Sequence, residues 1–201
     1  MSPPPMVVGV SGGIGSGKSM FAAAMQSLGC DVIDADAVAH DVLDQPEVQE
    51  MLAAWWGAEV ILPSGVDRAA IARIVFDDAA ARQKLEQLVH PRVESICRGR
   101  IEASKPASGV VVLDAPLLFE AGWDAWCDCV VFIDAPESVR RARVRANRGW
   151  NDAEFQARSD VQIPLDEKRA RSDHVLVNAE DPASLRRQTA GLLDRLQPRT
   201  D

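Results

Sequence analysis

Long hydrophobic runs are absent from this sequence of 201 residues. Its apolar stretches, such as residues 110–113, are far shorter than the roughly 20 residues that a membrane-spanning helix needs. The opening residues, MSPPPM, contain no basic residue and no apolar segment of their own, so we expect no signal peptide there. These features exclude a membrane protein and predict a cytoplasmic one.

Cysteines are few, and none is spaced like a metal ligand. Cys127 and Cys129 are separated by a single residue, which fits neither a C-x-x-C redox pair nor a zinc knuckle. Together with Cys30 and Cys97, they are typical of reduced thiols that serve as small apolar residues. We therefore expect no cysteine metal site.

Basic residues are outnumbered by acidic residues, 22 against 30, so the formal net charge is −8. This charge excludes general affinity for nucleic acids and for anionic membranes. Residues 137–171 are the exception, because they contain nine basic and six acidic residues and carry a net charge of +3. A basic segment in an acidic protein indicates a particular anionic ligand.

Short apolar segments rich in Val and Ile are the candidate strands. They lack the alternation of polar and apolar residues that half-exposed strands have, which is typical of buried parallel strands. Helical segments lie between them, so the pattern predicts an α/β fold with a doubly wound, five-stranded parallel sheet. The five segments are residues 6–10, 31–34, 110–114, 130–134 and 174–178.

About 75 residues separate the second candidate strand from the third, and this insert looks wholly helical. Pro46 can begin a helix that ends at Trp56 before Gly57. Asp67 fits the N-cap of the next helix, and we expect Pro91 to begin another. A second insert, residues 139–171, is rich in Arg and poor in large apolar residues, so we expect it to be helical and mobile.

The segment GGIGSGKS, residues 12–19, contains the P-loop pattern G-x-x-x-x-G-K-S between an apolar strand and a helix-like run. Glycines let backbone N–H groups surround phosphate oxygens, and the helix N-terminus adds the positive end of its dipole. Lys18 would reach the β- and γ-phosphates, and the Ser19 hydroxyl would ligate Mg²⁺. We predict that ATP with Mg²⁺ binds to Gly13, Ile14, Gly15, Ser16, Gly17, Lys18, Ser19 and Met20.

A P-loop alone does not distinguish a kinase from a switch GTPase or a mechanical ATPase. No lysine here follows an asparagine, so the N-K-x-D motif of GTPases is absent. The small size and the two helical inserts favour a small-molecule kinase, in which one insert holds the acceptor and the other closes over the phosphates. A nucleotide-binding regulator is the alternative from another class, and it would leave the Arg-rich insert without a function.

Two carboxylates, Asp34 and Asp36, follow the second candidate strand, where ligands bind in open α/β sheets. In an extended segment, residues two apart point to one side. A carboxylate there can accept a proton from an attacking hydroxyl or hold Mg²⁺ through water. Alternatively, one of the pair is the N-cap of a helix that starts near Ala37.

Five segments, in this order along the chain, resemble dephospho-coenzyme A kinases. That family transfers the γ-phosphate of ATP to the ribose 3′-hydroxyl of dephospho-CoA, the last step of coenzyme A synthesis. The resemblance implies ATP and dephospho-CoA as substrates, and a monomer or weak homo-oligomer is expected. The five segments are residues 9–19, 32–40, 75–93, 114–124 and 162–178.

The resemblance also implies a single P-loop kinase domain, a three-layer sandwich that resembles the nucleoside-monophosphate kinases. Its parts would be a core, an inserted helical lobe that binds CoA and a helical lid over the phosphates. The core would comprise about residues 6–38, 107–138 and 172–201, the lobe about 39–106, and the lid about 139–171.

Several site residues carry over from the family. Asp36 matches its catalytic base, and Asn178 matches a residue near the adenine of ATP. We expect Arg143, among the arginines of the lid, to contact phosphate. The family commonly has Thr after the P-loop serine, and here the backbone N–H of Met20 is expected to serve. The remaining motif residues are Glu120, Gln162, Lys168 and Asp173.

On the acceptor side, His90 matches the His-Pro of the family's substrate lobe, and Leu117, Leu118 and Phe119 match the motif that lines the acceptor site. Without the resemblance, we would interpret His90 as a packing histidine and residues 117–119 as part of the hydrophobic core. The rival enzyme is a kinase for nucleoside monophosphates or a sugar acid, and the motif DAPLLFE argues against it.

Overall fold

The structure, a computed structural model, describes residues 4–179 and 181–197. The chain divides into two compact units. The first unit contains the described residues up to Asp34 and from Ile101 onward, and the second is Ala35–Arg100.

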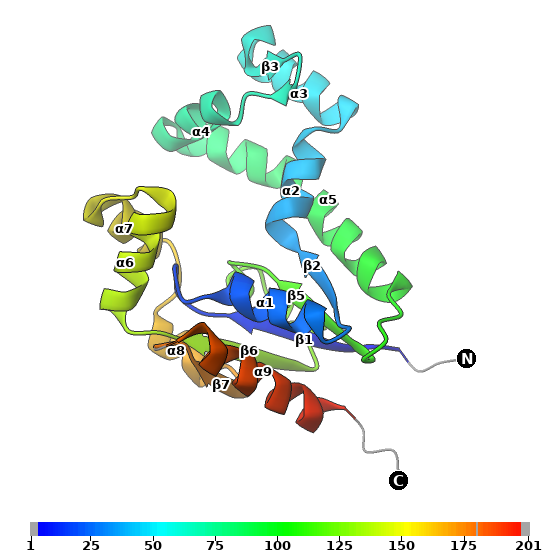
Figure 1. The fold of residues 1–201 in the computed structure, drawn as a ribbon. Coiled ribbons are helices and arrows are strands. Elements are labelled where there is room, and N and C mark those ends of the chain that lie inside the picture. The colour runs from blue at the N-terminus through cyan, green and yellow to red at the C-terminus, as the bar shows by residue number, and fades with distance from the viewer. Residues whose placement is uncertain (1–3, 180, 198–201) are drawn as a thin grey trace. The chain divides into compact units, whose positions relative to one another are not determined.

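The first unit is built on a five-stranded parallel sheet, which confirms the predicted fold class. Its strands are β1 (Met6–Ser11), β2 (Asp31–Asp34), β5 (Val110–Asp114), β6 (Cys129–Asp134) and β7 (His174–Val177). Their order is β2-β5-β1-β6-β7, so β1 is central (Figure 1). The chain crosses to one side of β1 for β2 and β5 and to the other for β6 and β7, and ligands of open α/β sheets bind at such a reversal.

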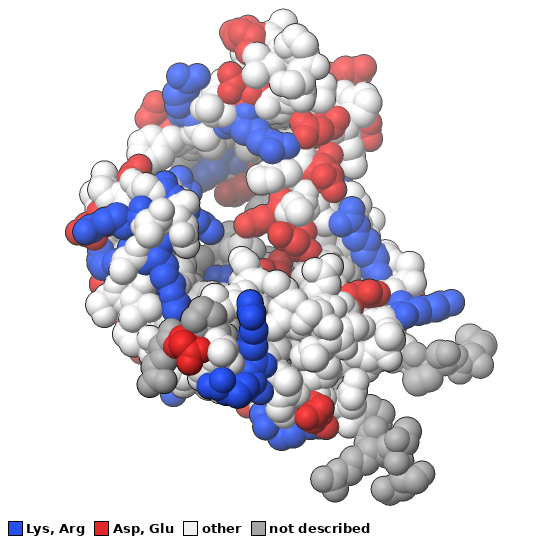
Figure 2. Space-filling view, in the orientation of Figure 1, with Lys and Arg blue, Asp and Glu red and all other residues white. Residues whose placement is uncertain are grey.

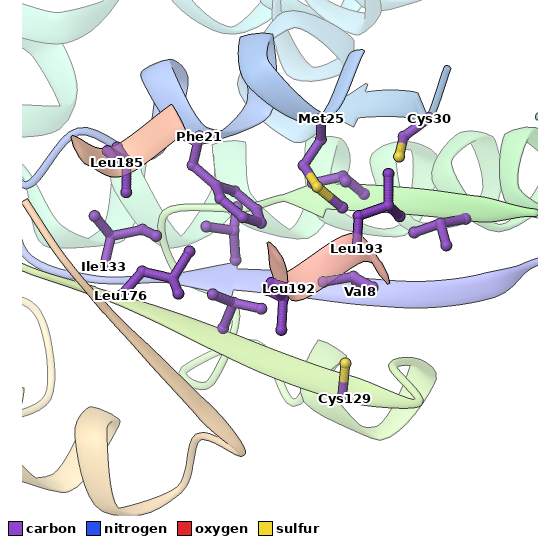
Figure 3. Close-up of a cluster of buried hydrophobic side chains, with 14 residues drawn as sticks. Val8, Phe21, Met25, Cys30, Cys129, Ile133, Leu176, Leu185, Leu192 and Leu193 are labelled. Atoms are coloured by element: carbon purple, nitrogen blue, oxygen red, sulfur yellow. The ribbon is translucent and has the colours of Figure 1, made fainter. Parts of the chain in front are cut away.

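Helices α1 and α9 cover one face of this sheet and close the main core. Figure 3 shows Phe21 and Met25 of α1 gathered with Leu192 of α9 over Val8 of β1. All four side chains are fully buried, and burial of a side chain of this size contributes roughly 1.5–3 kcal/mol. The helices of the unit are α1 (Lys18–Ser27), η2 (Trp123–Trp126), α6 (Glu137–Arg148), α7 (Asp152–Ser159), α8 (Leu165–Ala170) and α9 (Pro182–Leu196).

The second unit contains one hairpin, so the prediction of a wholly helical insert is wrong. Residues 61–62 and 65–66 pair as antiparallel strands around Pro63 and Ser64. Gly65 has a φ of 119°, which suits a tight turn, and Pro, Ser and Gly are the residues that favour turns over helices. The elements are α2 (Ala35–Leu43), α3 (Pro46–Trp56), η1 (Ala58–Val60), β3 (Ile61–Leu62), β4 (Gly65–Val66), α4 (Arg68–Asp77) and α5 (Ala79–Ala103).

Two predicted helix ends in this unit are confirmed. Helix α3 begins at Pro46 and is followed by Gly57, whose φ is 92°. Helix α4 begins after Asp67, whose side chain accepts a hydrogen bond of 3.0 Å from the backbone N–H of Ala70. The patterns of Pro at the start, Gly after the end and Asp at the N-cap therefore predicted real boundaries.

Pro91 does not begin a helix, contrary to the prediction, because α5 runs through it. A proline inside a helix removes one hydrogen bond and crowds the carbonyl four residues earlier. Here Arg92 Nη1 donates to the carbonyl oxygen of Leu88 at 2.8 Å, in the same turn of the helix. The buried residues Val89 and Val93 lie on both sides of Pro91, so one apolar face holds the helix together. Although α5 has 25 residues, neither it nor any other described helix is long and apolar enough to cross a membrane.

Candidate functional site

The P-loop connects β1, the central strand, to α1. Gly17 is the N-cap of α1 and has a φ of 105°, a conformation that favours glycine. A Cβ at this position would also lie 2.1 Å from Asn178 Nδ2, so only glycine fits. The N–H groups of a helix's first turn lack partners within the helix, and at this turn they are suited to bind phosphate.

Lys18 lies over the loop that precedes it. Its Nζ donates to the carbonyl oxygens of Gly12 at 2.9 Å and Gly13 at 3.4 Å. These contacts hold the ammonium group beside the N–H groups that would receive phosphate, as the P-loop pattern predicts. The side chain of Ser19, in the first turn of α1, is exposed.

Arg143 and Asn178 meet at the carbonyl oxygen of Ser16. Asn178 Nδ2 donates to this oxygen at 2.7 Å, and Arg143 Nη1 donates to it at 3.3 Å. Arg143 Nη2 also donates to Asn178 Oδ1 at 3.2 Å. Asn178 follows β7 and is buried, with 2% of its surface exposed. The structure therefore brings both predicted residues to the P-loop, whereas a contact between Asn178 and adenine stays a prediction.

Arg140 is a residue that the sequence analysis did not single out. It is buried, and it donates to the carbonyl oxygens of Ala135 at 3.2 Å and Ile14 at 3.4 Å. Burial lowers the pKa of the Arg140 guanidinium, and an arginine still stays charged at neutral pH. The available signal was its spacing from Arg143 and Val144, because residues three and four apart share one helix face.

The other arginines of α6 are paired within the basic segment. Arg141 Nε donates to Glu137 Oε1 at 2.7 Å, and Arg141 Nη1 reaches Asp152 Oδ1 at 3.3 Å. Arg145 Nη2 lies 3.3 Å from Asp152 Oδ2. The contacts with Asp152 join α6 to α7, and both guanidinium groups have carboxylate partners. Figure 2 shows the basic side chains gathered over α6 and α7.

Stacking on Trp150 holds two further arginines. The guanidinium carbon of Arg148 lies 5.0 Å from the ring centroid of Trp150, and that of Arg158 lies 4.2 Å from it. Such cation–π contacts stabilise by about 0.5–1 kcal/mol at exposed sites. Arg143, the arginine predicted to contact phosphate, is therefore directed to the P-loop, together with Arg140.

A cavity of about 350 Å³ lies beside the P-loop on the side of α6 and α7. Arg140 contributes positive charge to its wall, and Glu137 and Asp160 contribute negative charge. Phe155 is the buried residue beneath Arg141, whose guanidinium carbon is 4.5 Å from the ring centroid. A mixed polar and apolar pocket of this kind suits a small ligand. Its wall also includes Gly13, Ile14, Gln162, Ile163 and Leu165.

The positions of the two carboxylates after β2 differ from the prediction. Asp34 is the last residue of β2 and is level with Asp114 at the end of β5. Helix α2 begins at Ala35, so Asp36 lies in its first turn, and the expectation that an extended backbone points both carboxylates to one side is wrong. The predicted start near Ala37 was also late, because Ala35 is buried and already belongs to the helix.

The predicted acceptor residues are divided between the two units. Leu117 is 42% exposed in the first unit, whereas Leu118 and Phe119 are 1% and 5% exposed and belong to its core. Asp36 and His90 belong to the second unit, on α2 and α5, and both are exposed. The P-loop residues, Arg143 and Asn178 are thus the predicted site residues whose mutual contacts the structure establishes.

The described residues contain no group of three or more His, Cys, Asp or Glu side chains that could hold a metal ion. The exposed hydroxyl of Ser19 is a single oxygen ligand at the start of α1. A Mg²⁺ ion that arrives with ATP takes most of its ligands from phosphate oxygens and water. This donor set therefore fits a nucleotide-bound Mg²⁺ ion.

Comparison with known proteins places the chain among small-molecule kinases. Residues 6–183 match the family model described as dephospho-CoA kinase. A dephospho-CoA kinase of Anaeromyxobacter dehalogenans is 42% identical over 195 residues, which cover 94% of this chain and 90% of the relative. One of Syntrophotalea carbinolica is 40% identical over 197 residues, or 96% of this chain and 93% of the relative. A crystal structure of a Thermus thermophilus protein, 34% identical, aligns with a TM-score of 0.83 over 98% of this chain and 100% of its own.

Proposed function

The chain belongs to the dephospho-CoA kinase family, and on that premise we propose that it transfers the γ-phosphate of ATP to the ribose 3′-hydroxyl of dephospho-CoA. The products are coenzyme A and ADP, so the reaction is the last step of coenzyme A biosynthesis. The observation that carries this function is the family match over residues 6–183, which includes an intact P-loop.

The P-loop would bind the phosphates of ATP through residues 13–20. Lys18 would balance the charge of the β- and γ-phosphate oxygens as the phosphoryl group leaves, and Arg143 would add a second positive charge from α6. The contacts of Arg143 and Asn178 with Ser16 support this assignment, because they hold the guanidinium beside the loop. Asn178 would serve ATP binding by holding that loop.

Ser19 would hold Mg²⁺ together with the phosphate oxygens of ATP. When bound, the ion supplies positive charge that offsets the negative charge of the phosphates. The exposure of Ser19 at the N-terminus of α1 supports this assignment.

Asp36 would be the general base that accepts the proton of the ribose 3′-hydroxyl. A ribose hydroxyl is a poor nucleophile at neutral pH, so a positioned carboxylate helps the transfer. Support comes from the family motif and from the chain path, since Asp36 is only two residues beyond Asp34 at the end of β2. Asp34 would anchor that turn or a Mg²⁺-bound water.

The second unit would bind the CoA portion of the acceptor, with His90 and residues 117–119 contributing to the acceptor site. Residues 139–171 would be the lid that closes over the phosphates. The division of the chain at Ala35 and Arg100 supports a separate substrate lobe, and the arginines of α6 at the P-loop support a lid. These parts would let the enzyme bind two substrates and then exclude water.

An ADP-release assay on the purified protein tests the function. Dephospho-CoA, AMP and gluconate are offered in turn with ATP and Mg²⁺. We expect turnover with dephospho-CoA alone, and turnover with another acceptor alone would identify a different small-molecule kinase. If the protein binds ATP and phosphorylates none of the three, a nucleotide-binding regulator becomes the better interpretation.

A further inference from the structure

The ion pair between Lys168 and Glu120 in the first unit is largely buried and is not part of the chemistry proposed above. Lys168 Nζ is 2.9 Å from Glu120 Oε1, and their side chains are 1% and 17% exposed. Glu120 lies in the loop between β5 and η2, and we call residues 115–120 of this loop the acceptor loop. Lys168 belongs to α8, near the end of residues 139–171, so the pair joins two parts of the chain that are 48 residues apart.

The same two side chains also bind backbone groups of both segments. The N–H of Ile163 donates to Glu120 Oε1 at 3.0 Å, and Lys168 Nζ donates to the carbonyl oxygen of Pro116 at 3.4 Å. Each charged residue is therefore bonded to the backbone of the segment that carries the other. Such reciprocal contacts determine where residues 162–165 lie relative to the acceptor loop.

Residues 162–165 in turn contact the P-loop. Leu165 Cδ1 lies so near Gly13 that a Cβ at Gly13 would be 3.1 Å from it. Gln162, Ile163, Pro164 and Leu165 line the cavity of about 350 Å³ beside Gly13 and Ile14. The pair therefore supports one wall of the cavity beside the P-loop.

Stability alone is a poor explanation for this pair. Removing a charged pair from water is costly, and well-packed apolar residues are often as stable or more stable in its place. Glu120 Oε2 is also buried without a hydrogen-bond partner among the described residues, which adds to the cost. This cost directs attention to a role other than stability, such as positioning.

We propose that Glu120 and Lys168 are positioning residues, which hold residues 162–165 against the P-loop turn at Gly13 and join the acceptor loop to the base of the lid. Neither residue needs to touch a reacting atom. A displacement of about 1 Å at a reacting group can cost about 100-fold in rate, so losing this support lowers the rate of transfer. The expected effect on the rate rests on the proposed function. The claim that the pair holds residues 162–165 rests only on the contacts above.

The decisive variant replaces both charges with apolar side chains, Glu120→Met with Lys168→Met. Lys168→Met alone leaves a buried carboxylate unpaired and can fail to fold, and the double variant removes that problem. We expect the double variant to melt at least as high as Lys168→Met and near wild type, with kcat reduced tenfold or more. Glu120→Gln, which keeps an oxygen acceptor for the N–H of Ile163, should lose less of kcat.

A matched control is available in a more exposed pair between neighbouring segments. Arg171 Nη2 lies 3.0 Å from Asp124 Oδ2, with side chains 40% and 29% exposed. Exposed pairs contribute about 0–1 kcal/mol, so Asp124→Asn should keep kcat within about twofold of wild type.

Hydrogen exchange of the Ile163 amide supplies a readout that does not depend on catalysis. We expect faster exchange in the double variant, unchanged exchange in Asp124→Asn, and ATP affinity within a few fold of wild type in both. If the double variant regains both stability and kcat, or if its Ile163 amide stays protected, the positioning role is overturned. If wild type does not phosphorylate dephospho-CoA, the proposed function fails, and Ile163 exchange still decides whether the pair holds residues 162–165.

Discussion

Arg143 and Asn178 are hydrogen-bonded to each other at 3.2 Å, and both donate to the carbonyl oxygen of Ser16. One residue comes from α6, within the proposed lid, and the other follows β7, so two separate elements contact the P-loop. A guanidinium that is held on two acceptors loses little additional freedom when phosphate binds, which favours its use there.

Arg143→Ala should lower kcat by about 100-fold or more, because it removes a positive charge that acts on the transferred phosphoryl group. Arg145→Ala is the matched control, since Arg145 pairs with Asp152 at the surface and should leave kcat nearly unchanged. Steady-state kinetics of ATP and dephospho-CoA turnover measures both. Equal losses of kcat in the two variants would show that the total positive charge of α6, and not the position of Arg143, affects the rate.

Lys18→Ala should nearly abolish transfer, with a loss of about 10²–10³ in rate, because the β- and γ-phosphate oxygens lose their fixed positive charge. Lys105→Ala, an exposed lysine outside the site, should behave like wild type. Activity of Lys18→Ala within about twofold of wild type would refute the P-loop assignment.

Ser19→Ala should raise the Mg²⁺ concentration needed for half-maximal rate, and an unchanged Mg²⁺ titration would count against Ser19 as a ligand.

Asp36→Asn keeps the shape of the side chain and removes the proposed base. The affinity for ATP should hold while kcat falls by roughly 10²–10⁴. Asp34→Asn should instead reduce the stability of the fold or its response to Mg²⁺. Isothermal titration with ATP, together with turnover, separates the two variants, and near-normal turnover of Asp36→Asn beside an inactive Asp34→Asn would reverse the assignment.

Cys127 and Cys129 should be unreactive in the folded protein. Burial raises the pKa of Cys127 to about 12 and that of Cys129 to about 11, so the reactive thiolate is scarce at pH 8. A thiol reagent should react with them slowly until denaturant is added. Rapid modification of both at pH 8 in the folded protein would contradict this.

The same shifts predict a loss of stability in alkaline solution. The folded protein keeps these thiol protons where the unfolded chain, with ordinary pKa values near 9, releases them. Their contribution is therefore fully present below pH 9 and is lost as the pH rises toward 11 and 12. Urea unfolding at pH 8 and pH 10 should show this decrease, and it should be smaller in Cys127→Ala.

Much of the architecture was predictable because the signals are local. Buried parallel strands need continuous apolar segments, and a phosphate-binding turn needs glycines before a lysine and a serine, so β1, the P-loop and α1 could be identified from adjacent residues. Asp67 and Gly57 marked helix boundaries for the same reason. The family followed from five such segments in order.

Other features depended on residues that are distant along the chain. Pro91 looked like the start of a helix, but α5 runs through it, with buried residues on both sides. Asp36 looked extended, but α2 begins directly after β2. In both places the conformational preference of a single residue did not decide the structure, because packing contributes more to a helix than the preference of one residue.

The sequence by itself determined the five strands of the parallel sheet, the phosphate-binding loop and the basic character of residues 137–171. Only the tertiary structure decided which basic side chains face the loop. The arginine side chain is long and can bind any acceptor that the fold brings near it. Arg145 pairs with Asp152, Arg148 stacks on Trp150, and Arg143 donates to the carbonyl oxygen of Ser16. The burial of Lys168 beside Glu120 is decided in the same way, since no pattern of adjacent residues encodes a pairing across 48 positions.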